Sequence, residues 1–435
     1  MSVGHEVLWK WLLASLLVYL AQHPVGGQTA APASSVEPSP PAGYGWNGPE
    51  PVTSFDGVAT DAHLAGDDEG TVHVVWIAEA KSIHYRALTR GGWQEAELVE
   101  ESGTRSIKPA AVRLAARRGA LWMVHRRDVS SGRSRVIAMQ HTSEGWSDRE
   151  RLCDTRRTLV PPVVHIDGDD QVQVYWFVQL RPSKIMRHVQ HELYTRRLGP
   201  EGWSEETRVL APTVNIRTPC ICFDQQDQAH VAWFTWFREA MTGVGREITR
   251  SHHGFAHQVT GGRADSLRPP KTWPFLIMEP DKTTMAAAID GAGHWHGLVR
   301  AHPRVVGEQE DHFFYVTNRS GAWPSEVTPI VTRPFRSTGA LLAASLNEGR
   351  VLLAWQEGAS LHGFVVQDGQ RSAEWDVPIE GDVVAWVGSP QGIFHLLTSQ
   401  LEVTRPRWHK TTTLFYYSLS PTDTTEQGSP GDTTQ

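Results

Sequence analysis

The chain repeats one pattern seven times, and this repeat constrains the fold more than any other feature. Each copy has an apolar strand, a turn rich in Gly and Asp, a second strand ending in Trp or another apolar residue, a third strand, and a short Gly-Trp strand. The clearest copy spans Asp61–Val99. Alternating apolar positions are typical of half-buried strands. A period of roughly 45–60 residues with four short strands predicts a β-propeller.

The Gly-Trp marker sets the limits of the repeats. It occurs at Trp46, Trp93, Trp146 and Trp203, and returns in modified form at Trp323 and Trp375. Two repeat lengths separate Trp203 from Trp323, so one copy near Gly261–Gly262 is degenerate. We expect seven blades, at about 52–99, 100–152, 153–210, 211–270, 271–330, 331–380 and 381–419. A ring of six blades is the alternative if the degenerate region is not a blade.

The two ends of the repeat are complementary. Trp46 has no strands before it, whereas the last repeat, Asp382–Leu419, has three strands and no Gly-Trp strand after it. We therefore expect residues 44–51 to supply the missing fourth strand, which joins the two ends and leaves no open sheet edge. The all-β propeller then occupies residues 44–419 and is expected to be a monomer.

The residues before and after the repeats predict an exported protein. Lys10 precedes the apolar run Trp11–Ala21, which has the length of a signal-peptide core and is short for a membrane span. We expect a signal peptide at 1–29, a linker rich in Pro, Ser and Ala at 30–43, and a disordered tail at 420–435. The protein would be secreted or periplasmic with no membrane span. A short uncleaved anchor is the alternative.

Charge and cysteine content exclude several classes of function. The net charge of −7 argues against a nucleic-acid partner, since such proteins carry a basic surface. Neither a zinc-type cysteine spacing nor a phosphate-binding Gly-Lys-Ser/Thr run is present, so we expect no cofactor. Cys153, Cys220 and Cys222 leave two alternatives open: one disulfide from Cys153 to either of the others, or buried free thiols.

Several polar residues fit a framework role. The acidic turns at 67–70, 167–170 and 224–227 lack the full spaced set of oxygen ligands of a calcium loop. Turn chemistry explains them, and no metal site is expected. His73 and His230 recur at matching positions in second strands, which also indicates a structural role.

Departures from the repeat indicate where a site would be built. The connection between second and third strands is short in the first blade, at 77–81, and long in three adjacent blades, at 178–190, 235–247 and 300–312. In a propeller these loops share a face with the connections that cross between blades. Blades three to five therefore form a raised wall on one face, and long loops on a rigid scaffold commonly carry sites.

Arginines precede several first strands. The candidates for ligand binding are Arg105, Arg157, Arg217 and Arg336. We expect these side chains to converge around one mouth of the central channel. A planar guanidinium binds carboxylate or sulfate in a bidentate manner, so the group favours an anionic ligand. The alternative is that the arginines pair with neighbouring carboxylates and connect the blades.

Titratable side chains gather in the same wall. The catalytic candidates are His188, Tyr194, His302 and Asp311. A pair of carboxylates is the minimum for glycoside hydrolysis. A His and a Tyr beside arginines would instead abstract a proton next to a uronate carboxylate. For each candidate the alternative is a solvated loop residue.

The Asp-Gly turn, the "HVVW" strand and the "IHYR…GGW" hairpin together resemble the sialidase-like, BNR-type propeller superfamily. The resemblance covers almost the whole ordered chain but lies in the scaffold. The sequence lacks both the Ser-x-Asp-x-Gly-x-Thr-Trp boxes of true sialidases and their Arg-Ile-Pro motif, so no site residue is carried over.

These observations predict an exported propeller that binds a carbohydrate, acidic or neutral, on the loop face of blades three to five. Glycan cleavage, by a sialidase-like hydrolase or a polysaccharide lyase, is one expected activity. A lectin-like or protein-interaction propeller without chemistry is the alternative.

Overall fold

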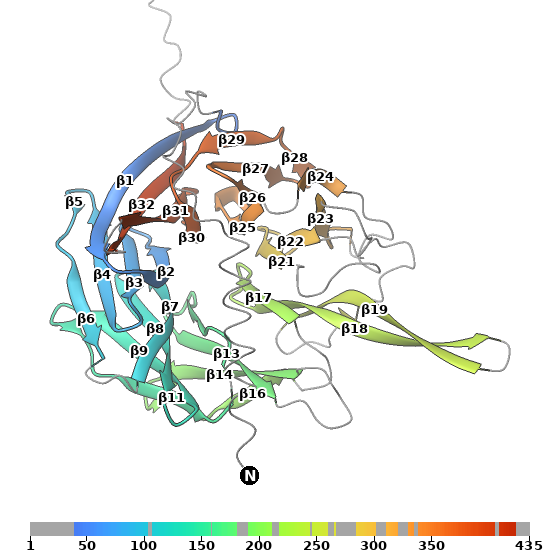
Figure 1. Cartoon of the computed structure of the whole chain (residues 1–435), viewed down its shortest axis with the longest axis horizontal. Helices are drawn as coiled ribbons and strands as arrows, with labels where there is room; N and C mark the ends of the chain where they lie inside the picture. The colour runs from blue at the N-terminus through green and yellow to red at the C-terminus, as the bar shows by residue number, and fades with distance from the viewer. Residues whose placement is uncertain are drawn as a thin grey trace, which may run out of the picture. The chain divides into compact units, whose positions relative to one another are not determined.

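The computed structural model describes residues 39–102, 107–157, 159–180, 190–210, 217–243, 246–259, 265–266, 284–301, 310–320, 329–334, 338–404 and 409–422. These residues form seven small antiparallel sheets (Figure 1). Each sheet is one blade of a seven-bladed β-propeller, which confirms the predicted fold over the six-bladed alternative. Among the described residues, no helix has the length and apolar character needed to cross a bilayer.

The first three blades share one plan, in which the fourth strand is split into two pieces. Blade one is β2 (Ala59–Gly66), β3 (Val72–Ala78), β4 (Ser82–Thr89), β5 (Gly92–Trp93) and β6 (Glu97–Glu101). Blade two is β7 (Ile107–Arg117), β8 (Ala120–Val129), β9 (Arg133–Thr142), β10 (Gly145–Trp146) and β11 (Glu150–Thr155). Blade three is β12 (Val163–Ile166), β13 (Val172–Leu180), β14 (Gln190–Gly199), β15 (Gly202–Trp203) and β16 (Thr207–Leu210).

The other four blades complete the ring. Blade four is β17 (Arg217–Phe223), β18 (Ala229–Gly243), β19 (Arg246–Val259) and β20 (Asp265–Ser266). Blade five is β21 (Thr284–Ile289), β22 (Trp295–Ala301), β23 (Glu310–Thr317) and β24 (Pro329–Pro334). Blade six is β25 (Thr338–Ser345), β26 (Val351–Glu357), β27 (Ser360–Gln367), β28 (Gln370–Arg371) and β29 (Trp375–Pro378). Blade seven is β30 (Asp382–Gly388), β31 (Phe394–Thr404), β32 (His409–Pro421) and β1 (Tyr44–Asp56).

The N-terminal strand closes the ring, as predicted. Strand β1 pairs antiparallel with β32, from Tyr44 opposite Pro421 to Asp56 opposite Thr411. The closing strand therefore runs past the predicted end at residue 51. Upstream of it, Ser39 pairs with Asp376 of β29, so part of the predicted linker lies along the outer strand of blade six.

The Gly-Trp marker forms only the first piece of the fourth strand. Trp93 pairs with Leu88, and the equivalent pair in blade six is Arg371 with Val366. Trp375 therefore lies in the second piece, opposite Gly363, and is not the equivalent of Trp93. A Cβ at Gly363 would lie 2.5 Å from the Trp375 indole, which explains the glycine.

An apolar cluster fills each of the seven junctions between blades. At the junction of blades two and three, Val124 of β8 packs with Trp176 of β13. At the closing junction, Leu414 of β32 packs with Leu64 of β2. Both faces of every blade are therefore covered by its neighbours, and this apolar burial is the main stabilising contribution to the ring.

The acidic turns between first and second strands are explained by their own hydrogen bonds. Asp67 Oδ1 accepts bonds from the amides of Glu69 (2.9 Å) and Thr71 (2.7 Å). The same pair of bonds starts the turns at Asp167, Asp224 and Asp290. Each of these aspartates is therefore occupied in shaping a turn.

Buried histidines connect these turns to the second and third strands. His73 lies 3.5 Å from Asp67 and 2.8 Å from the hydroxyl of Tyr85. His230 lies 3.1 Å from Asp224 and 3.0 Å from His257. The structure thus places His73 and His230 at equivalent framework positions.

The three cysteines are free thiols. Cys153 packs at the junction of blades two and three, whereas Cys220 and Cys222 pack at the junction of blades four and five. The disulfide alternative does not hold, because these thiols belong to different junctions.

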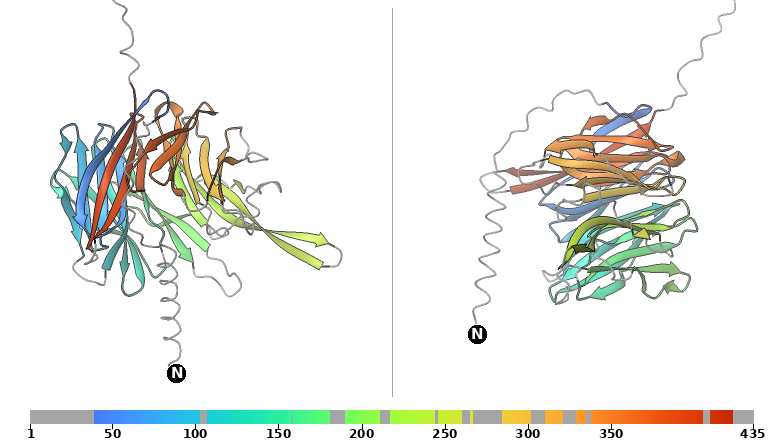
Figure 2. Two further views of the ribbon diagram at one scale, coloured as in Figure 1. Left: turned by 45° about the horizontal axis from the view of Figure 1, so that its top comes forward. Right: turned by 90° about the vertical axis from the view of Figure 1, so that its right-hand side faces the viewer.

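The predicted long loop at 235–247 is instead a regular β-ribbon. Strands β18 and β19 stay paired out to Gly243 opposite Arg246, and the ribbon extends away from the ring (Figure 1, Figure 2). The middle parts of the other two predicted loops, 181–189 and 302–309, lie outside the described residues.

Truncation tests the closing strand. A chain that begins at residue 57 lacks β1 and leaves the edge of β32 unpaired, so we expect a lower midpoint of thermal unfolding and aggregation. The amide of Thr422 donates to the carbonyl of Gly43 (2.8 Å), so the missing strand can be supplied from the other end. Fusing residues 43–56 after Thr422 through a short Gly-Ser linker should restore both properties, measured by calorimetry and light scattering. Equal stability of the truncated and full chains would contradict the closure.

Buried histidines should make the ring sensitive to acid. Burial lowers the pKa of His395 to about 4, while its Nδ1 lies 2.6 Å from the Tyr416 hydroxyl. The unfolded chain binds this proton near pH 6.5 and the folded chain only near pH 4. The stability contributed by neutral His395 is therefore complete above about pH 6.5 and is lost as the pH falls toward 4, by on the order of 3 kcal/mol.

Replacement of His395 measures this contribution. The variant H395Q cannot titrate, so its unfolding midpoint should fall less steeply than that of the wild type between pH 6.5 and 4.5. The exposed His409, changed to Gln, is the matched control and should follow the wild type. Parallel curves for H395Q and wild type would contradict the assignment.

Candidate functional site

A groove of about 310 Å³ lies at the junction of blades two and three. Its lining is Leu152, Cys153, Asp154, Thr155, Arg157, Val178, Tyr194, Arg196 and Glu206. These residues come from β11, from the connection after it, and from the strands and turn of blade three. One lining residue, Val178, lies near the end of β13, two residues before the strand ends at Leu180.

A buried carboxylate organises one side of the groove. Glu192 of β14 accepts hydrogen bonds from Arg157 (3.3 Å), from Arg208 of β16 (3.2 Å) and from the hydroxyl of Tyr194 (2.9 Å). Its side chain is only 8% exposed. Charge-assisted bonds of this kind fix the positions of both guanidinium groups and of the phenol.

Asp154 of β11 organises the other side. Arg133 Nε donates to its Oδ1 (2.6 Å) and Arg135 Nε to its Oδ2 (3.1 Å), while Arg151 lies 3.5 Å away. The hydrogen bond from Arg133 is the main cause that lowers the pKa of Asp154, and it outweighs the effect of burial. This carboxylate is therefore ionised and engaged.

The remaining titratable side chains of the groove have raised pKa values. Burial and the charge of Glu192 raise the pKa of Glu206 despite the nearby charge of Arg196. Burial and the bond to Glu192 raise the pKa of Tyr194. Burial also raises the pKa of Cys153 to about 12, so its thiol stays neutral.

Among the described residues, six arginines and three carboxylates line the groove or belong to the ion pairs of Asp154 and Glu192, so this set has three more basic than acidic groups in a protein of net charge −7. We call this set the groove cluster. Its members are Asp154, Glu192, Glu206, Arg133, Arg135, Arg151, Arg157, Arg196 and Arg208.

The structure brings two of the predicted site residues together. Arg157 and Tyr194 meet on Glu192. Arg157 lies two residues after β11, and its partner is on a third strand, so it belongs to the outer half of the blade rather than to the channel mouth. Its pairing matches the alternative expectation, that arginines connect the blades.

The other predicted site residues cannot be placed in the groove. Four of them lie outside the described residues: Arg105, Arg336, His188 and His302. The structure describes the backbone of Arg217 and Asp311 but not their side chains. Their roles remain predictions.

Sequence analysis missed the residues that hold the groove together. Glu192 lies two residues before the candidate Tyr194, but its partners are 35 and 16 residues away, at Arg157 and Arg208. Pairing of β14 with β16 within blade three brings Arg208 to Glu192, whereas Arg157 reaches it from the connection between blades two and three. Tyr194 of β14 is paired directly with Arg208 of β16. An alignment of these two strands would therefore have placed Arg208 beside the candidate Tyr194.

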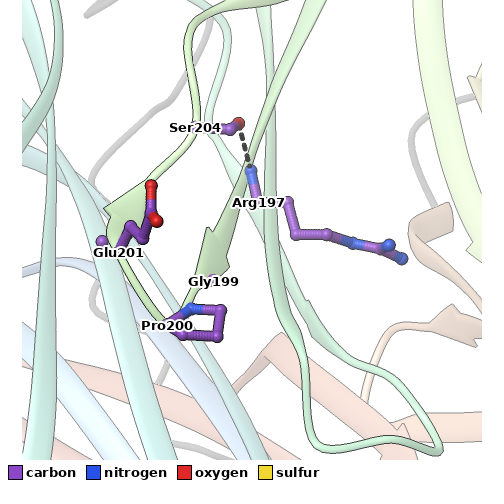
Figure 3. A pocket seen from close by; sticks show the side chains of 6 residues that line it. Arg197, Gly199, Pro200, Glu201 and Ser204 are labelled. Atoms are coloured by element: carbon purple, nitrogen blue, oxygen red, sulfur yellow. Dashed lines mark hydrogen bonds between the residues drawn. The ribbon is translucent and has the colours of Figure 1, made fainter.

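A second hollow, of about 380 Å³, lies at the tip of the β14–β15 hairpin. It is formed mainly by the turn Gly199–Gly202 and by Ser204, whose hydroxyl accepts a bond from the Arg197 amide (3.1 Å) (Figure 3). In Figure 3 the Arg197 side chain extends away from Pro200 and Glu201. Few polar groups converge on it, so the groove is the better candidate.

Comparisons with known proteins give no family assignment. No protein-family model matches the chain, and no curated protein matches its sequence. In the described residues, no group of three or more His, Cys, Asp or Glu side chains is arranged to hold a metal ion.

Solved structures of similar architecture include proteins that act on or bind carbohydrates. A mutant α-L-arabinofuranosidase of Fusarium graminearum with an iminosugar inhibitor has 10% identity, covers 74% of this chain and 93% of its own, and has a TM-score of 0.39. An ulvan lyase has 9% identity, covers 73% of this chain and 78% of its own, and has a TM-score of 0.42. A mutant Aleuria aurantia lectin with a bound sugar has 10% identity, covers 74% of this chain and 96% of its own, and has a TM-score of 0.37. Such likeness concerns the propeller architecture alone.

Substitution of Glu192 tests the groove network. The variant E192Q keeps the shape of the side chain but weakens the bonds to Arg157 and Arg208, so we expect a loss of about 1–3 kcal/mol in the free energy of unfolding. The matched control is E201Q at the exposed hairpin tip, with an effect below about 0.5 kcal/mol. Denaturant unfolding measures both. Equal stability of the two variants would show that the network is not formed.

Proposed function

We propose that this protein is an exported, monomeric β-propeller that binds a carbohydrate, with an acidic one favoured, in the groove between blades two and three. The observation that supports this proposal is the carboxylate of Glu192, fixed by Arg157, Arg208 and Tyr194 at the edge of a groove. Export rests on the predicted signal peptide at 1–29, and the monomer rests on the closed ring.

The groove offers the chemistry that sugar recognition needs. Sugar hydroxyls both donate and accept hydrogen bonds, and the groove cluster combines carboxylate acceptors with guanidinium donors. Several of these groups are already held by one another, so little conformational freedom is lost when a ligand binds. A small number of fixed polar groups in a concave surface is the usual design of a small-molecule site.

Cleavage of the bound glycan is a second part of the proposal. Glu206, with its raised pKa, suits a proton donor, and the ionised Asp154 suits a charge stabiliser. The raised pKa of Tyr194 and its bond to Glu192 keep this hydroxyl protonated, so a lyase would draw its base from the histidine candidates. The loop candidates His188, His302 and Asp311 are retained as further catalytic candidates.

A protein-interaction role is the alternative. Large exposed apolar side chains in the described part of the chain are Leu98, Leu401 and Val403, which lie on β6 and β31. Three such residues on two strands form a small apolar surface compared with a typical interface. The polar groove therefore favours a carbohydrate.

Binding and product analysis test the proposal. The full chain is screened against an array of neutral and acidic glycans, and the bound classes are incubated with it and analysed by mass spectrometry. The variant R157Q should weaken binding severalfold, because it releases one side of Glu192. Products with an added water would identify a hydrolase, and unsaturated products one water lighter a lyase. Binding without products would identify a lectin, and no binding would refute the proposal.

A further inference from the structure

One arginine of the groove cluster lacks a carboxylate partner. Arg157 and Arg208 share Glu192, and the three arginines of blade two share Asp154. Arg196 of β14 lines the groove, but it makes no ion pair within the part of the chain that the structure describes. Its Nε atom is buried without a hydrogen-bond partner.

The surroundings of Arg196 do not satisfy this group. Glu206 is close enough for the two charges to interact, yet no ion pair within 4 Å joins them, and burial outweighs the influence of Arg196 on Glu206. Cys153, also within electrostatic reach, is a neutral thiol. A buried donor without an acceptor costs free energy, so the protein alone does not satisfy the Arg196 guanidinium. Arg196 also lines the groove, and an acceptor supplied from outside can approach its side chain there.

The charge of the junction favours an acceptor that is negative. The groove cluster carries an excess of three positive charges, so an incoming oxyanion is attracted even though the whole protein is acidic. A guanidinium offers two parallel N–H groups, which match the two oxygens of a carboxylate or a sulfate.

We infer that Arg196 is the specificity-determining residue of the groove and binds the carboxylate or sulfate group of an acidic carbohydrate. This inference rests on the proposed function, and it adds the residue and the chemical group that are recognised. Tyr194 and Arg157, held by Glu192, then contact the rest of the sugar.

The inference differs from the arginine ring that the sequence predicted. That ring consists of Arg105, Arg157, Arg217 and Arg336 on the connections between blades, whereas Arg196 lies within a third strand. A side chain on a paired strand is held more rigidly than one on a connection, which suits a residue that selects between ligands.

The test compares three probes and three variants of the full chain by titration calorimetry. The probes are an oligogalacturonate, a sulfated dextran oligosaccharide and neutral maltohexaose. The variants are R196Q, R196K and, as matched control, R90Q in the exposed turn between β4 and β5. Circular dichroism and the unfolding midpoint confirm that each variant is folded.

We expect R196Q to weaken binding of an acidic probe at least about tenfold and to leave any neutral binding unchanged. R196K should bind with intermediate affinity, since lysine keeps the positive charge but lacks the two parallel N–H groups of a guanidinium. R90Q should behave as the wild type. Tighter binding of the oligogalacturonate would indicate that the groove recognises a carboxylate, and tighter binding of the sulfated dextran would indicate a sulfate.

Two results would overturn the inference. If R196Q binds an acidic probe as tightly as the wild type, or if neutral and acidic probes lose affinity equally, Arg196 does not select the anion, although carbohydrate binding in the groove stands. If no glycan of the array and no probe binds to the wild type, the proposed function fails and the inference fails with it.

Discussion

Apolar packing between the faces of neighbouring blades is the interaction on which the rest of this structure depends. A small sheet has two apolar faces, and a stack of such sheets would leave two of them in water. Bending the stack into a ring covers all of them, and the seven apolar clusters show that every junction is filled. The strand pairs within one blade provide its shape, but the junctions provide most of the buried apolar surface.

The same packing determines where polar chemistry can be placed. The inner part of the junction between blades two and three is closed by Val124, Val164 and Trp176. Ionised side chains there would lose their hydration, so they are confined to the outer strands and the connection between the blades. Glu192 is tolerated in a buried position because two guanidinium groups and a phenol replace its water. The groove is thus the place where the apolar layer ends.

The sequence carried most of the information on the ring, since its evidence is local. Strand alternation, the Asp turns and the unpaired Trp46 each report on a few neighbouring residues, and together they predict the blades and their closure. Where one marker residue was replaced, as at Arg371 in the Trp93 position, the alignment shifted to Trp375. The sequence of the β18–β19 ribbon departs from the repeat and therefore predicts a loop, although the two strands stay paired out to Gly243 and Arg246.

The groove could not be predicted in the same way. Its key contact joins Arg157 of one connection to Glu192 of the following blade, and nothing in the spacing of these residues fixes that distance before the blades pack. Tyr194 is a candidate from the sequence because it is a titratable side chain beside the predicted wall, whereas nothing local distinguishes Glu192 from a solvated acid. Arg196 stands out only when the partners of its neighbours are known.

Ring closure has a consequence for the order of events during synthesis. Strand β1 is made first, yet its pairing partner β32 ends at residue 421, and the Ala59 amide bonds to the Thr412 hydroxyl across 353 residues. Blade seven therefore cannot form until β32 has been made, and the first strand of the ring must wait for the last.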